Sequence, residues 1–85
     1  IYRALQDGKN LIISGERNAN AIREKITRTI SKGGISQIDY VSVAEAKTLI
    51  EISGNIPDNI LVSTAVFIGT TRLIDNFSYS IYSSK

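Results

Sequence analysis

The chain has 85 residues, of which 42% are hydrophobic and 21% are charged, a balance that favours one compact globular domain and excludes an intrinsically disordered chain. It contains no cysteine and no histidine, which excludes disulfides, thiolate metal sites and the commonest general base at neutral pH. The net charge is only +2, and no apolar run approaches the roughly 20 residues that span a bilayer. We therefore expect a single domain over residues 1–85 that does not span a membrane and lies in the cytoplasm. The first residue is isoleucine and methionine is absent, so we expect a piece of a longer polypeptide.

The first 34 residues are predicted to form two helices. Ile1, Leu5 and Ile12 share one face at helical spacing, and Ser14-Gly15 ends the first helix. Gly8 weakens this helix by about 1 kcal/mol relative to alanine. The second helix is predicted to begin after an N-cap at Asn18 or Asn20 and to end at Gly33-Gly34. Its inward positions recur at three and four residues: Ala19, Ile22, Ile26, Thr29 and Ile30.

The rest of the chain changes to β-branched and aromatic residues with period two. Residues 38–43 are predicted to form a strand with Asp39, Val41 and Val43 on one side. A turn at 44–47, a short strand or packed loop at 49–52 and a surface loop at 53–59 follow. The almost continuously apolar run 60–68 predicts a central strand covered on both faces. Gly69-Thr70 then makes a tight hairpin into a third strand over 71–81.

These elements predict an α+β fold. Two helices cannot bury their apolar stripes alone, and a three-stranded sheet has one face to cover. We therefore expect two N-terminal helices packed on one face of a small, mainly antiparallel three-stranded sheet.

A run of basic residues between 17 and 32 raises the possibility of binding to nucleic acid phosphates: Arg17, Arg23, Lys25, Arg28 and Lys32. No aromatic stacking platform accompanies them, and Glu16 and Glu24 dilute their charge. We interpret this basic helix as the solvent face of an amphipathic helix and keep a small nucleic-acid-binding module as the alternative. A protein-interaction domain is a third hypothesis, and it predicts an exposed apolar patch.

No constellation in the chain predicts catalysis. Gly33-Gly34 and Gly69-Thr70-Thr71 lack the spacing of phosphate-binding loops and are interpreted as turn glycines. Asp39, Asp75 and Arg72 have no histidine to work with, so we expect them to form hydrogen bonds or ion pairs that fix strand ends. Catalytic, cofactor-binding and metal-ligating residues are accordingly expected to be absent.

Three segments, taken in order, carry a resemblance to a known family. Thr71-Arg72-Leu73-Ile74-Asp75-Asn76, after Gly69, resembles the closing signature of pantothenate synthetases. Ile38-Asp39-Tyr40-Val41, with Thr48-Leu49 beyond it, is similar to a strand of that family, and Ile1-Tyr2-Arg3-Ala4-Leu5 resembles the helix that opens the family's carboxy-terminal domain. The chain departs from the pattern at Ser42 and Phe67, where many members have glutamate and tryptophan.

The resemblance implies that the chain is the carboxy-terminal lid domain of an ATP-dependent ligase that joins pantoate to β-alanine through a pantoyl adenylate. It places ATP and Mg²⁺ on a Rossmann-like amino-terminal domain of the same chain and none on this domain alone, and it implies a homodimer. The isolated domain is expected to be inactive. The signature residues are interpreted as structural: Asp39, Tyr40, Gly69, Arg72, Asp75 and Asn76.

Overall fold

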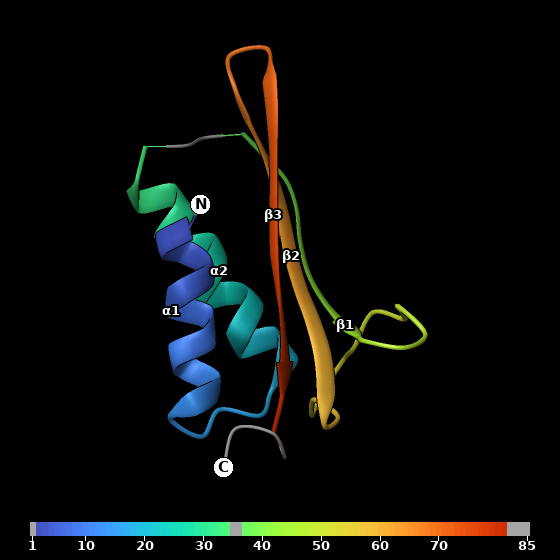
Figure 1. The fold of residues 1–85 in the computed structure, drawn as a ribbon. Helices are drawn as coiled ribbons and strands as arrows, with labels where there is room; N and C mark the ends of the chain where they lie inside the picture. Colours follow the sequence, from blue (N-terminus) through green and yellow to red (C-terminus); the bar gives the residue numbers. More distant parts are fainter. Residues whose placement is uncertain (1, 35–36, 82–85) are drawn as a thin grey trace.

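A computed structural model describes residues 2–34 and 37–81. Its elements are α1 (Tyr2–Ile13), α2 (Ala19–Lys32), β1 (Gln37–Glu45), β2 (Asn59–Ile68) and β3 (Thr71–Ser80). Both helices lie on the same face of the sheet (Figure 1). The predicted α+β class and the placement of the helices are therefore confirmed, while the expectation for Ile1 lies outside the described residues.

The three strands form one antiparallel sheet in the order β1-β2-β3. The predicted central position of β2 is thus confirmed. Gly69 and Thr70 make the two-residue loop between β2 and β3, because Ile68 and Thr71 already face each other as the last pair of the ladder. Gly69 has φ +62, a conformation that costs glycine little and suits the first position of a type II′ hairpin turn.

The hydrophobic core fills the space between the helices and the sheet. Ile22 and Ile26 of α2 and Val62 and Val66 of β2 have no solvent exposure. Leu5 and Ile12 of α1 join the same cluster, as their helical spacing predicts. Burying each such side chain contributes about 1.5–3 kcal/mol, so this layer supplies most of the stability of the domain.

Gly8 of α1 lies directly against the side chain of Ile26 of α2. A Cβ atom at this position would come within 2.7 Å of both Cδ1 and Cγ1 of Ile26, closer than real Cβ contacts. The residue that weakens α1 as an isolated helix therefore permits the close approach of the two helices. Its cost in helix propensity, about 1 kcal/mol, is offset by packing.

Asn18 is the N-cap of α2. Its side-chain Oδ1 accepts hydrogen bonds from the backbone N–H groups of Asn20 at 2.9 Å and Ala21 at 3.2 Å. This decides between the two predicted caps. It also places Arg17 before the helix, so that four of the five basic residues between 17 and 32 belong to α2.

The connection between β1 and β2 is irregular but anchored. A turn covers residues 46–48, and Glu51 makes an isolated bridge with Ala44. The predicted surface loop after it is tied to the start of α2, since Ile56 N–H donates to Arg17 O at 2.7 Å. Ile56 itself is buried. The loop is therefore packed against the domain over part of its length.

One face of the sheet carries no covering element among the described residues. Strand alternation and the pairing register place the following side chains on this open face: Tyr40, Ser42, Ala44, Leu61, Ser63, Ala65, Phe67, Arg72, Ile74, Asn76 and Ser78. The expectation that β2 is covered on both faces is therefore wrong for this domain. The run 60–68 places apolar side chains on both faces of β2, but the helices cover only one face of the sheet (Figure 1).

Candidate functional site

Three of the residues singled out by the family signature meet where the β2–β3 hairpin lies beside β1. Asp39 and Tyr40 belong to β1, and Arg72 is the second residue of β3. We call these three residues the hairpin cluster, and Gly69 lies beyond them in the loop of the hairpin. The cluster brings together segments that are 33 positions apart in the chain, which only the fold could show.

A β-bulge at Asp39 shapes the hairpin cluster. Ile38 pairs with Val66 and Tyr40 pairs with the next residue, Ala65, so Asp39 is an extra residue without a partner in the ladder. The Thr64 hydroxyl donates to Tyr40 O at 2.8 Å and satisfies a backbone acceptor beside the bulge. Ile38 packs against the core instead of Asp39, which corrects the predicted placement of Asp39 on one side with Val41 and Val43.

Arg72 reaches across β2 to the bulge. Its Nε and Nη2 atoms donate to Asp39 Oδ2 at 3.0 and 2.8 Å, and its guanidinium carbon lies 5.9 Å from the centroid of the Tyr40 ring. The ion pair expected between Arg72 and an aspartate is thus formed with Asp39. Both side chains are about 40% exposed, and an ion pair of this kind contributes about 0–1 kcal/mol. Its effect is to cancel two charges and to fix the position of the hairpin.

The other two signature residues lie away from the hairpin cluster. Asp75 accepts a hydrogen bond from the backbone N–H of Asn76 at 2.8 Å. Both residues line a shallow groove of about 280 Å³ between α1 and β3, whose wall on α1 includes Tyr2 and Lys9. Strand alternation places Asp75 on the face under the helices and Asn76 on the same face as Arg72, so the structure divides the contiguous signature between the two faces of β3.

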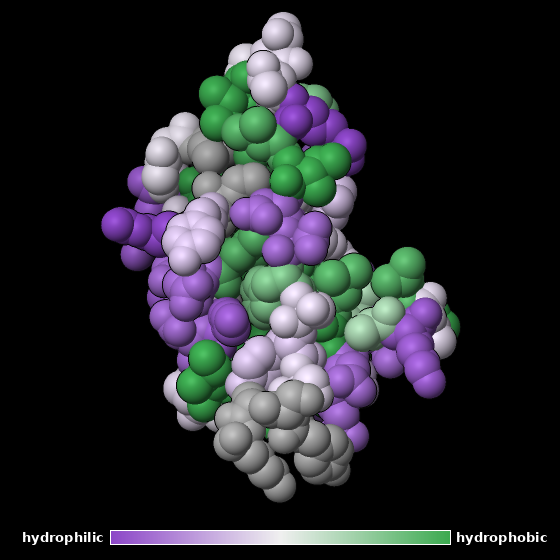
Figure 2. Space-filling model, in the orientation of Figure 1, coloured by the Kyte–Doolittle hydropathy of each residue, from purple (hydrophilic) through white to green (hydrophobic). Residues whose placement is uncertain are grey.

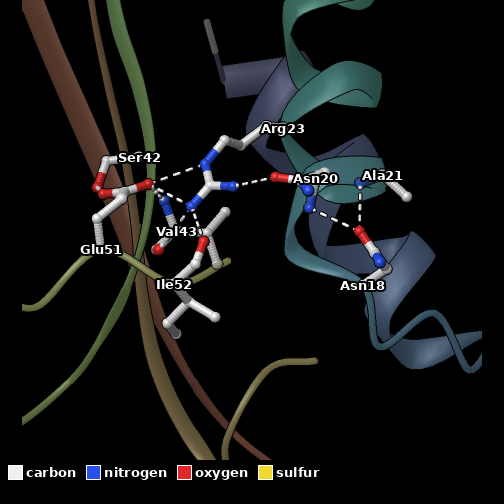
Figure 3. Close-up of polar contacts among 8 residues, drawn as sticks. All are labelled: Asn18, Asn20, Ala21, Arg23, Ser42, Val43, Glu51 and Ile52. Atoms are coloured by element: carbon white, nitrogen blue, oxygen red, sulfur yellow. Dashed lines mark hydrogen bonds and ion pairs between the residues drawn. The ribbon is translucent and has the colours of Figure 1, made fainter. Parts of the chain in front are cut away.

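A second polar cluster lies at the edge of β1 and was not predicted (Figure 3). Arg23 of α2 donates through Nε and Nη2 to Glu51 Oε2, at 2.8 and 2.5 Å, and its Nη2 also donates to the backbone carbonyls of Val43 and Ile52. Ser42 Oγ and the Val43 N–H donate to Glu51 at 2.5 and 2.9 Å. We call this group the Arg23 clamp, because it ties α2, β1 and the loop after β1 together.

The carboxylate of Glu51 is stabilised in its charged form. Partial burial raises the pKa of Glu51, but the hydrogen bonds from Ser42, Val43 and Arg23 together lower it by more. The pKa of Glu51 therefore lies below its usual value. The pKa of Glu45 is also lowered, chiefly by the hydrogen bond from the Thr48 backbone N–H. The hydrogen bonds that cause these shifts also tie the irregular connection after β1 to the strand.

The basic helix is less available than its sequence indicates. Arg23 is engaged in the clamp with only 20% of its side chain exposed, and Arg17 donates to Ile12 O and Glu16 O at 2.8 and 2.9 Å. The interpretation of all five basic residues as a solvent face is wrong for these two. The nucleic-acid alternative finds no support, since its proposed contacts are partly committed within the domain.

Within residues 2–34 and 37–81, no three carboxylate, histidine or cysteine side chains gather in a group that could hold a metal ion. No helix in the same ranges is long and apolar enough to cross a membrane.

The most conspicuous surface is apolar and lies at the hairpin end of the molecule (Figure 2). Four large side chains there are at least one third exposed: Phe67, Ile68, Leu73 and Ile74. The register places Phe67 and Ile74 on the open face with Tyr40, and Leu73 on the face that the helices cover further along. Exposed apolar side chains that gather on one face mark interaction surfaces.

Comparison with known proteins gives a consistent picture. A family model described as pantoate-beta-alanine ligase matches residues 1–78. The chain is 42% identical over 81 residues to a pantothenate synthetase of Clostridium botulinum strain Langeland, and 43% identical over 81 residues to that of Clostridium novyi, which is 95% of this chain in each case. A pantothenate synthetase of Herpetosiphon aurantiacus is 41% identical over 76 residues, or 89% of this chain. The chain spans 28% of the length of these relatives.

Proposed function

The chain belongs to the pantoate-beta-alanine ligase family, and from this membership we propose that it is the carboxy-terminal lid domain of an ATP-dependent ligase that joins pantoate to β-alanine. The observation that carries the proposal is identity of about 42% maintained over 95% of the chain to proteins named pantothenate synthetase. Pantothenate biosynthesis in the cytoplasm, by a homodimer of the longer protein, is part of the proposal.

The reaction proposed for the whole enzyme has two steps. The carboxylate of pantoate attacks the α-phosphate of ATP, so that pantoyl adenylate forms and pyrophosphate leaves. The amine of β-alanine then attacks the acyl carbon, so that the amide forms and AMP leaves. The described residues of this chain do not fit a site for ATP or Mg²⁺, since they offer no cluster of metal ligands and the loop before α2 contains the single glycine Gly15 instead of a glycine-rich phosphate loop. We assign both to a preceding Rossmann-like domain.

The task that remains for this domain is to cover the reacting groups. An acyl adenylate is hydrolysed by water, and closure of a lid excludes water while the amine attacks. A lid must keep its shape when it moves, and the helical core, the Arg23 clamp and the hairpin cluster provide that rigidity. Asp39, Tyr40, Gly69, Arg72, Asp75 and Asn76 are accordingly proposed to shape the hairpin and its surroundings and to take no part in bond making.

The test is an assay of AMP release with ATP, pantoate and β-alanine, run on the full-length parent protein and on the 85-residue chain. We expect AMP and pantothenate in equal amounts from the full-length protein and no turnover from the 85-residue chain. A full-length protein without activity contradicts the ligase assignment. Turnover by the 85-residue chain contradicts the role of a lid.

A further inference from the structure

We propose that the open face of the sheet is the surface on which the preceding part of the same polypeptide docks. The inference rests on the proposed function, because it takes the chain to be the carboxy-terminal part of a longer ligase. It goes further by naming the surface that meets the rest of the enzyme.

The apolar side chains of the open face are concentrated toward the hairpin. Tyr40, Ala65 and Ile74 lie side by side in one row across the three strands, and Phe67 lies in the adjacent row. Ala65 is fully buried between its two neighbours, whereas Ile74 is 56% exposed and Tyr40 and Phe67 are 36% exposed. Each of the three exposed residues thus presents apolar surface that further burial would stabilise, at about 25 cal/mol for each Å².

The charges on the open face do not oppose docking. Its strands carry Arg72 and, at the bulge, Asp39, and these two already neutralise each other at 2.8 Å. Removing such a pair from water together costs less than removing either charge alone. The outward surface of the helices differs, because it exposes Arg3, Glu24 and Arg28. Of the two sides of the domain, the open face is therefore the one suited to burial.

The connection after β1 adds a second wall to this surface. It projects away from the helices on the side of the open face (Figure 1), and Leu49 and Ile50, which follow the turn at 46–48, are 63% and 66% exposed. Leu49 has φ +61, which is uncommon for a leucine and costs about 1–3 kcal/mol. A strained backbone that exposes two apolar side chains fits a segment whose side chains contact the preceding part of the polypeptide.

The occupant follows from the length of the relatives. The chain spans 28% of them and matches their carboxy-terminal part, so about 70% of such a protein precedes residue 1. The Tyr2 end of α1, where that part joins, lies nearer to the hairpin than the Ile13 end does (Figure 1). Because α1 lies on the opposite side of the sheet from the open face, a preceding domain reaches the open face by passing around the edge strand β3, where Tyr2 lines a groove together with Asp75 and Asn76.

Hydroxyl-radical footprinting of the full-length parent protein tests this inference with a matched pair of residues. Ile74 on the open face and Ile13 on α1 have the same side chain and nearly equal exposure in the domain, 56% and 58%. We expect Ile74 to be modified at no more than about one third of the rate of Ile13, because the centre of an interface loses contact with water. Equal rates, or slower modification of Ile13, overturn the proposal.

Two substitutions test the docking surface, and the dependence of protection on protein concentration identifies the occupant. Ile74→Gln in the full-length protein is expected to raise modification of Phe67 about threefold, whereas Ile13→Gln is expected to leave it unchanged. If footprinting protection appears only at protein concentrations at which the protein is dimeric, the occupant is a second copy and the proposal fails. Footprinting does not depend on turnover, so an active enzyme with an unprotected Ile74 refutes this inference and leaves the ligase assignment intact.

Discussion

The two faces of the sheet both carry apolar side chains, but one face is buried under the helices and the other is exposed. The face under the helices uses valine and isoleucine to build a sealed core, in which Val43, Ile60 and Val62 have no exposure. The open face carries Tyr40, Phe67 and Ile74, which remain in contact with water. The two arginine pairs differ in the same way, since Arg23 joins three elements while Arg72 lies on the surface. The comparison indicates that the covered face sustains the fold and that the open face is kept for a contact.

The largest expected effect contrasts one isoleucine from each face. Ile26→Ala removes a side chain without solvent exposure and leaves a cavity beside Gly8, so we expect it to lower the free energy of unfolding by about 2–5 kcal/mol. Ile74→Ala removes a side chain that is 56% exposed, and we expect a loss of no more than about 1 kcal/mol. Urea denaturation of the 85-residue chain measures both.

Similar losses for the two variants would break the distinction between the faces. A large loss at Ile74 would mean that the open face stabilises the isolated domain, and that its exposure is not reserved for a partner. The m-values provide the control, because comparison of the midpoints is valid only if the slope with urea is unchanged.

An intermediate effect separates the two arginines. Arg23→Met removes the ion-pair partner of Glu51 and the arginine hydrogen bonds to two backbone carbonyls, so we expect a loss of about 1.5–3 kcal/mol. Arg72→Met removes a surface pair with Asp39, and we expect a loss of at most about 1 kcal/mol. Methionine keeps much of the apolar stem of arginine in both variants. Equal losses, measured by the same denaturation, would contradict the view of Arg23 as a clamp.

The sequence predicted the order of elements and the position of the helices because those depend on local periodicity. Each of these signals is contained in a short stretch of sequence: the spacing of Leu5 and Ile12, the glycine turn at Gly69 and the apolar run of β2. The bulge at Asp39 was missed, since nothing in a period-two pattern marks an extra residue whose effect depends on its partner strand. Gly8 was recognised as a cost, and only the crossing of α1 and α2 shows why it is needed.

The Arg23 clamp was missed for a related reason. Basic residues on an amphipathic helix are usually solvated, and Glu51 lies 28 positions away in an irregular segment. A carboxylate flanked in the sequence by Ile50 and Ile52 was the available signal, because a charge placed between apolar residues often has a specific partner. Pairing over such a distance follows from the fold and cannot be read from spacing.

The smallest effect concerns pH and sharpens the role of the clamp. The pKa of Glu51 in the folded chain lies below its ordinary value of 4.5, because the hydrogen bonds from Ser42, Val43 and Arg23 outweigh partial burial. The charged form therefore contributes stability above about pH 4.5, and this contribution is lost as the pH falls through the lower folded value. We expect Glu51→Gln to be less stable than the native chain near neutral pH and the difference to shrink in acid. A difference in urea midpoint that stays constant across this range would show that Glu51 acts through its shape and that its charge is not needed, since glutamine keeps the size of the side chain and loses only the titration.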